Sequence, residues 1–382
     1  TRGFPDESVL DVWLERCRAH VEQVLKGKSS RVDHLSPNIM AAIHQLQRHF
    51  VITVVDKSAN DFAFICKKYY ITCLQHELNS NAYHSEQSAT ADINQHQHTF
   101  LQQHGLERKQ QPANQQQQHK QLRPPFPFFY GIFKAHKGTI RFIAASRRAV
   151  LRPLSILLSR FLQHLVQPAN ELWNATVGKI GLVGSGCWMV QDSLGVIRKI
   201  KALNHSIIST TTRTVSSYDF TTMYTTIPQA DLVDKLTLLV RMLFAASHRG
   251  QFNAIRIQGR HTTWVKAAAA NLNRAGVTVD TLRFDTLFRF LVSNIFVTFA
   301  GKTYRQSTGI PMGTNCAVFV ANLYLYFYEL RFIDRLVQAN RKQEVGSLLY
   351  NARYVDDLLV NEMKDSPQHF SDYLDDQKSP IY

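Results

Sequence analysis

Two adjacent aspartates, Asp356 and Asp357, lie in the apolar segment 352–360, and a third, Asp219, lies upstream between Tyr218 and Phe220. Adjacent carboxylates in an apolar setting repel each other and lose hydration, so a cation is normally needed beside them. Two Mg²⁺ ions about 4 Å apart can activate a 3′-hydroxyl and stabilise a leaving pyrophosphate. The three aspartates therefore suggest two-metal nucleotidyl transfer, with Mn²⁺ as a substitute ion.

Asp-Asp pairs also occur at exposed turns, and the chain has a second pair at Asp375-Asp376. Its flanks are polar, and we interpret it as a solvated loop or helix end. The flanks of the first pair, Tyr354-Val355 and the apolar residues 358–360, instead predict a β-hairpin from a covered sheet with the carboxylates at its turn.

The composition favours a globular, nucleic-acid-binding protein. The chain has 382 residues, 45% of them hydrophobic, which is ample for a sizeable core. Its net charge of +15 favours a polyanionic partner. A basic surface also suits an anionic membrane, but there is no run of about 18 apolar residues and no signal-peptide pattern. We therefore expect an intracellular protein without a membrane partner.

Cysteine and histidine give no sign of a structural metal. The scattered cysteines form no C-x-x-C motif, which predicts buried, reduced thiols at Cys17, Cys66, Cys73, Cys187 and Cys316. The histidines of one polar stretch are interpreted as low-complexity sequence rather than a ligand cage: His96, His98 and His104.

Hydrophobic periodicity predicts the elements that must position the aspartates. Helical spacing predicts helices over 6–27, 38–50, 153–166, 192–203, 229–244, 281–294 and 317–331. Strand patterns predict hairpins with turns at 58–61, Lys137-Gly138 and Ala300-Gly301, and a strand over 212–220 that delivers Asp219. The polar, glutamine-rich stretch 79–123, most extreme at Gln115 to Gln118, predicts that part of it is a mobile insertion or linker.

Two glycine-rich segments lie outside these elements. The glycines at 181, 184 and 186 fit neither a P-loop nor a dinucleotide fingerprint, so we interpret them as a loop. Gly309 and Gly313 flank Pro311, and such a loop lets the backbone approach a ligand closely. A tight turn before a core helix is the alternative.

The order of three segments resembles the successive catalytic motifs of reverse transcriptases. They are the Asp219 segment, Gly309-Ile310-Pro311-Met312-Gly313 and Tyr354-Val355-Asp356-Asp357. Residues 218–228 and 309–322 are similar in particular to Penelope-like retroelements, the relatives of telomerase. The resemblance covers roughly residues 50–382 and implies an α+β right-hand polymerase fold, with an antiparallel palm sheet and packed helices.

The same resemblance implies a domain order. It places an N-terminal helical segment at 1–50, fingers at 51–210 with the polar insertion at about 80–123, and a palm at 211–382. Because the chain begins at Thr1 and ends at Tyr382, just before the next expected palm element, we interpret it as a fragment without the thumb or any downstream endonuclease.

The resemblance also implies roles for single residues. Metal ligation falls to Asp219, Asp356, Asp357 and the Phe220 carbonyl. Nucleotide contacts fall to Arg141, Lys134, Lys137, Tyr224, Met312 and Gly313, with Lys57 assisting. Template or primer contacts fall to Gly309, Pro311, Gln306 and Tyr354. Met312 stands where relatives commonly have glutamine, which puts a polar contact there in doubt, and each lysine equally suits a solvated surface.

Tyr224 resembles the aromatic gate that excludes a ribose 2′-hydroxyl, because a flat ring under the sugar leaves no room for an extra oxygen. An ordinary helix-packing tyrosine is the alternative. The activity implied is RNA-directed DNA polymerase, with an RNA template, a DNA primer and dNTPs as partners and a nuclear or intracellular location. Two alternatives stay open: an RNA-dependent RNA polymerase, which Tyr224 and Val355 disfavour, and a truncated copy that only binds nucleic acid.

Overall fold

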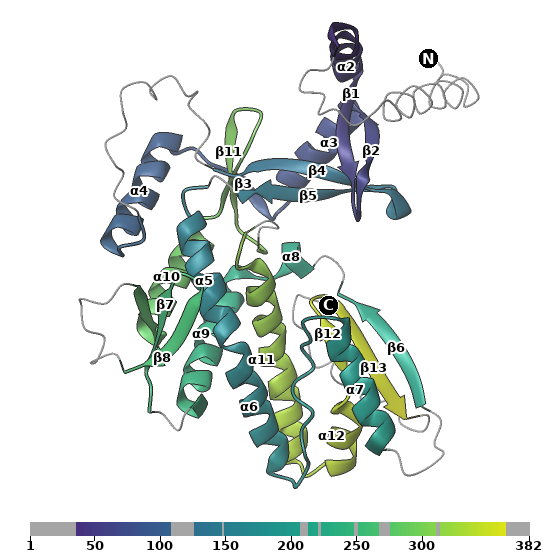
Figure 1. Cartoon of the computed structure of the whole chain (residues 1–382). Coiled ribbons are helices and arrows are strands. Elements are labelled where there is room, and N and C mark those ends of the chain that lie inside the picture. Colours follow the sequence, from purple (N-terminus) through teal and green to yellow (C-terminus); the bar gives the residue numbers. More distant parts are fainter. Residues whose placement is uncertain are drawn as a thin grey trace.

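The computed structural model describes residues 36–107, 126–146, 149–206, 213–220, 223–247, 251–266, 276–310 and 314–363. These residues form a mixed α/β structure (Figure 1). Within them, the strands make one seven-stranded sheet and two three-stranded sheets, with most helices in a body between the sheets. No helix of this part is long and apolar enough to cross a membrane.

The seven-stranded sheet has the order β2-β1-β4-β10-β11-β3, with β5 paired to β4. Its strands are β1 (Phe50–Val55), β2 (Ser58–Cys66), β3 (Tyr83–Ser85), β4 (Phe128–Lys134), β5 (Thr139–Ala145), β10 (Phe296–Phe299) and β11 (Lys302–Gln306). β4 is its centre, because β5 pairs antiparallel along its whole length while β1 and β10 join it in parallel at opposite ends. A short 3₁₀ turn, η2 (Ala135–Lys137), connects β4 to β5.

Helix α3 (Lys67–Leu78) covers one face of this sheet. It buries Tyr70, Leu74 and Leu78 against sheet residues that include Phe129 and Ile140. The Tyr70 hydroxyl accepts a hydrogen bond from the Gly131 N–H at 2.7 Å, so α3 is tied to the middle of β4. Helix α2 (Pro37–His49) precedes β1, and the Ser36 side chain accepts a hydrogen bond from the Ile39 N–H at its start.

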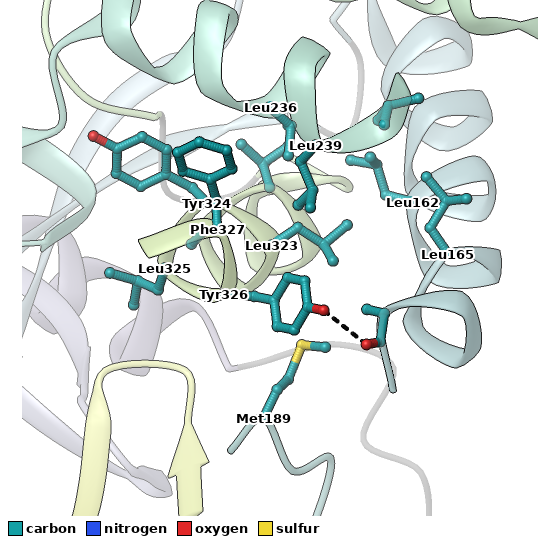
Figure 2. Close-up of a cluster of buried hydrophobic side chains, with 14 of the residues drawn as sticks. Leu162, Leu165, Met189, Leu236, Leu239, Leu323, Tyr324, Leu325, Tyr326 and Phe327 are labelled. Atoms are coloured by element: carbon teal, nitrogen blue, oxygen red, sulfur yellow. Dashed lines mark hydrogen bonds between the residues drawn. The ribbon is translucent and has the colours of Figure 1, made fainter. Parts of the chain in front are cut away.

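The helical body surrounds α11 (Ala317–Gln338), which is mostly apolar and buries most of its residues. Figure 2 shows α11 side chains between leucines of α5 and α9, with the Tyr326 hydroxyl donating to the Ala169 carbonyl at 2.7 Å. The other helices of the body are α5 (Arg152–His164), α6 (Val166–Gly178), α9 (Gln229–Ala246), α10 (Thr281–Ser293) and α12 (Lys342–Leu348). This body is the main hydrophobic core.

The two small sheets lie on the helical body. One has the order β12-β13-β6 and the other the order β8-β7-β9. Their strands are β6 (Arg213–Asp219), β7 (Ala254–Gln258), β8 (His261–Val265), β9 (Val277–Asp280), β12 (Ala352–Tyr354) and β13 (Asp357–Met363). The remaining helices are α4 (Thr90–Gln103), α7 (Ser193–Ser206) and α8 (Met223–Thr226).

Most predicted elements within the described residues are confirmed, but two differ. The first hairpin turns at Asp56-Lys57, with Lys57 at φ +65°, rather than at 58–61, because the register pairs Ile52 with Phe64 and Val55 with Ser58. Helix 317–331 continues to Gln338. The helix expected over 6–27 lies outside the described residues.

Within the polar stretch 79–123, the described residues 79–107 are folded. It contains β3 and α4, and α4 buries Ile93, Gln97 and Leu101, which recur every four residues. Its histidines belong to this packing: His98 Nδ1 lies 2.6 Å from Glu107 Oε1, and the His96 and His104 rings contact phenylalanines. Residues 108–125 lie outside the described part.

Two parts of the fold were not expected from the sequence. Helix α6 contains Pro168, but in the first turn of a helix the missing N–H is no loss. The sheet β8-β7-β9 falls in a stretch to which no element was assigned, although Ile255 and Ile257 alternate as a half-buried strand requires.

The seven-stranded sheet takes strands from both sides of the expected domain boundary at residue 210.

The cysteine prediction is confirmed in part. The four cysteines that the structure describes are free thiols. Cys187 and Cys316 are buried, and burial raises the pKa of their thiols to about 11 and about 12. Cys66 is exposed and Cys73 half-buried, so for these two the expected burial is wrong. Cys17 lies outside the described residues.

Candidate nucleotidyl-transfer site

The three aspartates meet at one end of the sheet β12-β13-β6. β6 and β13 pair antiparallel over seven positions, and the last pair brings Asp219 opposite Asp357. The Phe220 N–H donates to the Asp356 carbonyl at 3.0 Å, which extends the pairing past the end of β6. β12 and β13 form the predicted hairpin, with Asp356 and Asp357 at its turn. The pair Asp219 and Asp357 shares one register position although 137 residues lie between them in the sequence.

Asp356 is the most buried of the three carboxylates. Burial raises its pKa, and the neighbouring charges of Asp357 and Asp219 raise it further, while Arg141 acts in the opposite direction. Asp219 and Asp357 are exposed at the surface. Because like charges and burial both disfavour ionised Asp356, a cation at this position would relieve both.

The carboxylate types suit Mg²⁺, which takes oxygen ligands. Among the residues that the structure describes, no group of three or more His, Cys, Asp or Glu side chains is arranged to hold a metal ion. The aspartates therefore share a sheet edge without closing into a cage. Magnesium sites that act on nucleotides are commonly completed by water and substrate phosphates, so an open carboxylate set fits that chemistry.

A strained two-residue turn carries Asp356. The hairpin closes at the pair Tyr354 and Asp357, and Val355 has φ +57°. A β-branched residue in the left-handed region is a true outlier, and the first position of such a turn is ordinarily glycine. The backbone next to the carboxylates is thus held in a conformation that the local sequence disfavours.

Arg353 supports this turn from below. It is fully buried, and its Nη1 donates to the Val355 carbonyl at 2.9 Å. Its guanidinium pairs with Glu329, which is also fully buried, and donates to the Asn322 side chain at 2.8 Å. The sequence analysis did not single out these residues. The available signal was an arginine in an apolar strand one residue before the Tyr354 flank.

The cations of the β4–β5 hairpin face the carboxylates. Ile132 pairs with Arg141, so Arg141 and Lys134 project from the same face of the sheet. Burial and the charges of Arg141 and Lys137 lower the pKa of Lys134, whereas Asp56 and Asp219 act in the opposite direction. The structure therefore brings the predicted cations within electrostatic range of the predicted metal ligands.

Arg141 has a partner that the sequence did not indicate. Its Nη2 lies 3.3 Å from Asp56 Oδ2, at the turn of the β1–β2 hairpin. The Asp56 N–H in turn donates to the Phe133 carbonyl at 2.7 Å. Asp56 thus orients Arg141 from the neighbouring hairpin. Lys57 and Lys137 are exposed.

Tyr224 lies beside Asp356. It belongs to α8, which Figure 1 shows between the β4–β5 hairpin and the sheet that carries the aspartates. Burial, then the charge of Asp356, raises the pKa of Tyr224 to about 12. The Tyr224 ring is half-buried next to the predicted metal ligand, and its hydroxyl is protonated at neutral pH.

Gly309 and Gln306, two of the expected template contacts, pack against the protein itself. Gly309, at φ +81°, packs on α8: a Cβ there would collide with the Tyr224 carbonyl oxygen and lie 2.7 Å from Thr225 Cα. Its close approach is to the backbone of α8. Gln306 is 1% exposed and donates to the Thr308 carbonyl at 2.8 Å, so its amide is occupied inside the protein.

The other predicted residues have mixed positions. Tyr354 is 50% exposed beside the aspartates, as a template or primer contact requires. The Phe220 ring is buried, and its backbone N–H is used by Asp356. Pro311, Met312 and Gly313 lie outside the described residues, so their expected contacts stay predictions.

Comparison with known proteins identifies the fold but no family. No protein-family model matches the chain, and no curated protein matches it in sequence. Among solved structures it is similar to telomerase from Candida albicans in complex with a TWJ fragment of telomeric RNA, with TM-score 0.53 and 13% identity over 88% of this chain and 48% of that chain. The fold is telomerase-like.

Telomerase from Candida tropicalis, also in complex with a TWJ fragment of telomeric RNA, matches with TM-score 0.49 and 9% identity over 88% of this chain and 45% of that chain. The chain thus spans about half the length of the telomerase chains to which it is similar. The telomerase-like fold confirms the expected mixture of helices and sheets. At 13% identity it carries no activity over to this chain.

Proposed function

We propose that the chain is an RNA-directed DNA polymerase of the Penelope-like type, which transfers a dNTP to a primer 3′-hydroxyl. The observation that carries this proposal is the register pair Asp219 and Asp357, with Asp356 beside it and the Lys134–Arg141 hairpin opposite. Carboxylates for metal and cations for a triphosphate, facing each other across a telomerase-like fold, suit nucleotidyl transfer.

Asp219, Asp356, Asp357 and the Phe220 carbonyl would hold two Mg²⁺ ions, with Mn²⁺ as a substitute. When bound, such ions lower the pKa of a 3′-hydroxyl and stabilise charge on the leaving pyrophosphate. Burial and the neighbouring carboxylates both raise the pKa of Asp356. A metal ion beside Asp356 would favour its ionised form, so this environment fits the role of a metal ligand. No covalent intermediate on the protein is required.

The remaining residues bind and orient the substrates. Arg141 offers a planar fork to triphosphate oxygens, fixed by Asp56, and Lys134 adds a point charge. Tyr224 would lie under the incoming sugar and exclude a ribose 2′-hydroxyl. Tyr354 would contact the template or primer. The net charge of +15 would hold an A-form-like template-primer duplex through its phosphates, without sequence readout.

In this proposal the β4–β5 hairpin belongs to the fingers and the sheet β12-β13-β6 to the palm. The Pro311-Met312-Gly313 loop would lie beneath the nucleotide and template. A nuclear location, a DNA primer and dNTPs as substrates belong to the same proposal. The resemblance of residues 218–228 and 309–322 to Penelope-like retroelements supports it.

Primer extension tests the proposal. Poly(rA)/oligo(dT) is incubated with Mg²⁺ or Mn²⁺ and either dTTP or UTP, and the wild type is compared with Asp356→Ala and with Asp375→Ala. The second variant is a matched control, because it also removes one aspartate of an Asp-Asp pair. Incorporation of dTTP, lost in the first variant and kept in the second, with UTP excluded, is the expected result.

Two outcomes would redirect the proposal. Equal use of UTP and dTTP would favour an RNA-dependent RNA polymerase and remove the gate role of Tyr224. Retained binding of the hybrid with no incorporation by the wild type would favour a protein that only binds nucleic acid. Loss of hybrid binding in Asp356→Ala as large as the loss of synthesis would contradict a purely catalytic role for this carboxylate.

A further inference from the structure

Asp356 is held by its backbone on both sides. On its C-terminal side, the Asp356 carbonyl accepts the Phe220 N–H at 3.0 Å. On its N-terminal side, the Val355 carbonyl accepts from Arg353 Nη1 at 2.9 Å. Since these carbonyls belong to the two peptide planes that flank Asp356, the two hydrogen bonds together fix the direction of its Cα–Cβ bond.

Arg353 is itself immobilised from several elements. Its backbone N–H donates to the Trp188 carbonyl at 2.6 Å, and its carbonyl accepts the Val190 N–H at 2.9 Å. Its guanidinium is bound by Glu329 and by Asn322, both on α11. The most buried helix of the molecule thus positions the group that holds the turn.

The turn needs such support because of Val355. With φ +57°, this residue occupies a conformation that β-branched side chains disfavour. A local change that let Val355 relax would rotate the peptide plane that carries Asp356. A buried arginine with a fixed guanidinium prevents that rotation, whereas a solvated partner would not.

We infer that Arg353 is a positioning residue of the proposed polymerase site: through the Val355 carbonyl it maintains the strained turn that directs Asp356 toward the metal. The inference rests on the proposed function. Arg353 acts directly on the conformation of the turn, however, and this conformation can be measured without catalysis. An arginine that only neutralised Glu329 would stabilise the fold but leave the turn independent of it.

The test combines Arg353→Lys, Val355→Gly and the double variant. Lysine keeps the charge beside Glu329, but its ammonium has three donors on one atom and cannot reproduce the five hydrogen bonds that the guanidinium makes to Glu329, Asn322 and Val355. We expect Arg353→Lys to speed amide hydrogen exchange at Phe220 and Asp357, to weaken Mn²⁺ binding and to lower kcat by about 10- to 100-fold, as loss of a ligand's supporting partner does. Arg341→Lys, in the Arg341–Glu344 pair of α12, is the control and should change none of these.

The double variant separates positioning from general stability. Glycine adopts the turn conformation without strain, so in the Val355→Gly background the loss caused by Arg353→Lys should shrink to less than about fivefold. Equal losses in the two backgrounds would overturn the inference. Unchanged hydrogen exchange at Phe220 and Asp357 in Arg353→Lys would also overturn it.

A second pair of variants covers the case in which Arg353→Lys fails to fold. Glu329→Leu with Arg353→Met replaces the ion pair by apolar groups of similar volume, which a core commonly tolerates. The folded double variant should still show fast exchange at the turn and weak Mn²⁺ binding. If the wild type does not extend primers, the proposed function fails, yet hydrogen exchange still decides whether Arg353 holds the turn.

Discussion

Among the hairpin turns with residues in the left-handed region, the β10–β11 turn and the β12–β13 turn are built in opposite ways. The β10–β11 turn uses Ala300 at φ +49° and Gly301 at φ +77°, both exposed. The β12–β13 turn uses Val355 at φ +57° above the buried Arg353. The first needs no support because its residues suit the turn. The second places an unsuitable residue beside the carboxylates and holds it from the core, which is typical of a functional site.

The largest effect should come from the carboxylate itself. Asp356→Asn in the β12–β13 turn should lower primer extension by about a thousandfold or more, because a metal ligand contributes several kcal/mol to transition-state stabilisation. Ala300→Asn in the β10–β11 turn should leave the rate within about twofold, since asparagine accepts positive φ. Single-nucleotide incorporation rates measure both. A similar loss in the two variants would remove the contrast between the turns.

The next effect tests the buried support. Glu329→Gln should lower the free energy of unfolding by about 3–5 kcal/mol, because it leaves the Arg353 charge buried without its partner. Glu344→Gln, which acts on the partly exposed Arg341 pair of α12, should cost about 1 kcal/mol or less. Urea unfolding of both variants supplies the comparison. A loss below about 1 kcal/mol in Glu329→Gln would show that the buried Arg353–Glu329 pair adds little to the stability of the fold.

Exchange of the turn residues should give effects of different size. Gly301→Val should cost about 1–2 kcal/mol of stability from backbone strain alone, since no atom lies within 4 Å of the Cβ it would add. Val355→Gly relieves strain but adds freedom to the unfolded chain, so its net effect should stay within about 1 kcal/mol. Thermal and urea unfolding measure both. A large loss in Val355→Gly would mean that the valine side chain, not the conformation, is needed.

The smallest effect is the pH dependence of Asp356. Its folded pKa lies above the ordinary 3.8, so the folded state holds this proton more tightly than the unfolded state does. Stability of the wild type should therefore fall as pH rises from the unfolded pKa through the folded one, and then stay constant. Asp356→Asn lacks this titration, so its stability relative to the wild type should grow over the same window. Urea midpoints between pH 3 and 8 test this, and added Mg²⁺ should reduce the difference.

The sequence was sufficient to place both hairpin turns, but not to predict what supports the β12–β13 turn. Alternating apolar residues around Asp356-Asp357 and around Ala300-Gly301 were sufficient to place both hairpins, because strand periodicity is local. The three aspartates were grouped as candidate metal ligands, but the pairing of Asp219 with Asp357 in one register was not predicted, because the two strands lie far apart in the sequence. The support by Glu329 was out of reach, because it lies 24 residues from Arg353 on another element and no local pattern connects them.

Residues whose role depends on distant packing were the least predictable. Gln306 was expected at a template from the family resemblance, yet it is buried where β11 meets α9, and Gln229 donates to its carbonyl at 3.1 Å. Gly309 was recognised as a site of close approach, but the approaching group is the backbone of α8. In both cases the residue type indicated an unusual environment without indicating which surface supplies it.

The contact between Gly309 and α8 couples the position of Tyr224 to that of the Gly309-Ile310 backbone. The Gly309 N–H donates to the Ile227 carbonyl and the Ile310 N–H to the Tyr224 carbonyl, each at 2.7 Å. The backbone that bears Tyr224 therefore cannot shift without the backbone that leads into the 311–313 loop. If Tyr224 selects the sugar and that loop supports the template, selection of the sugar and selection of the base cannot be tuned separately by movements of either segment.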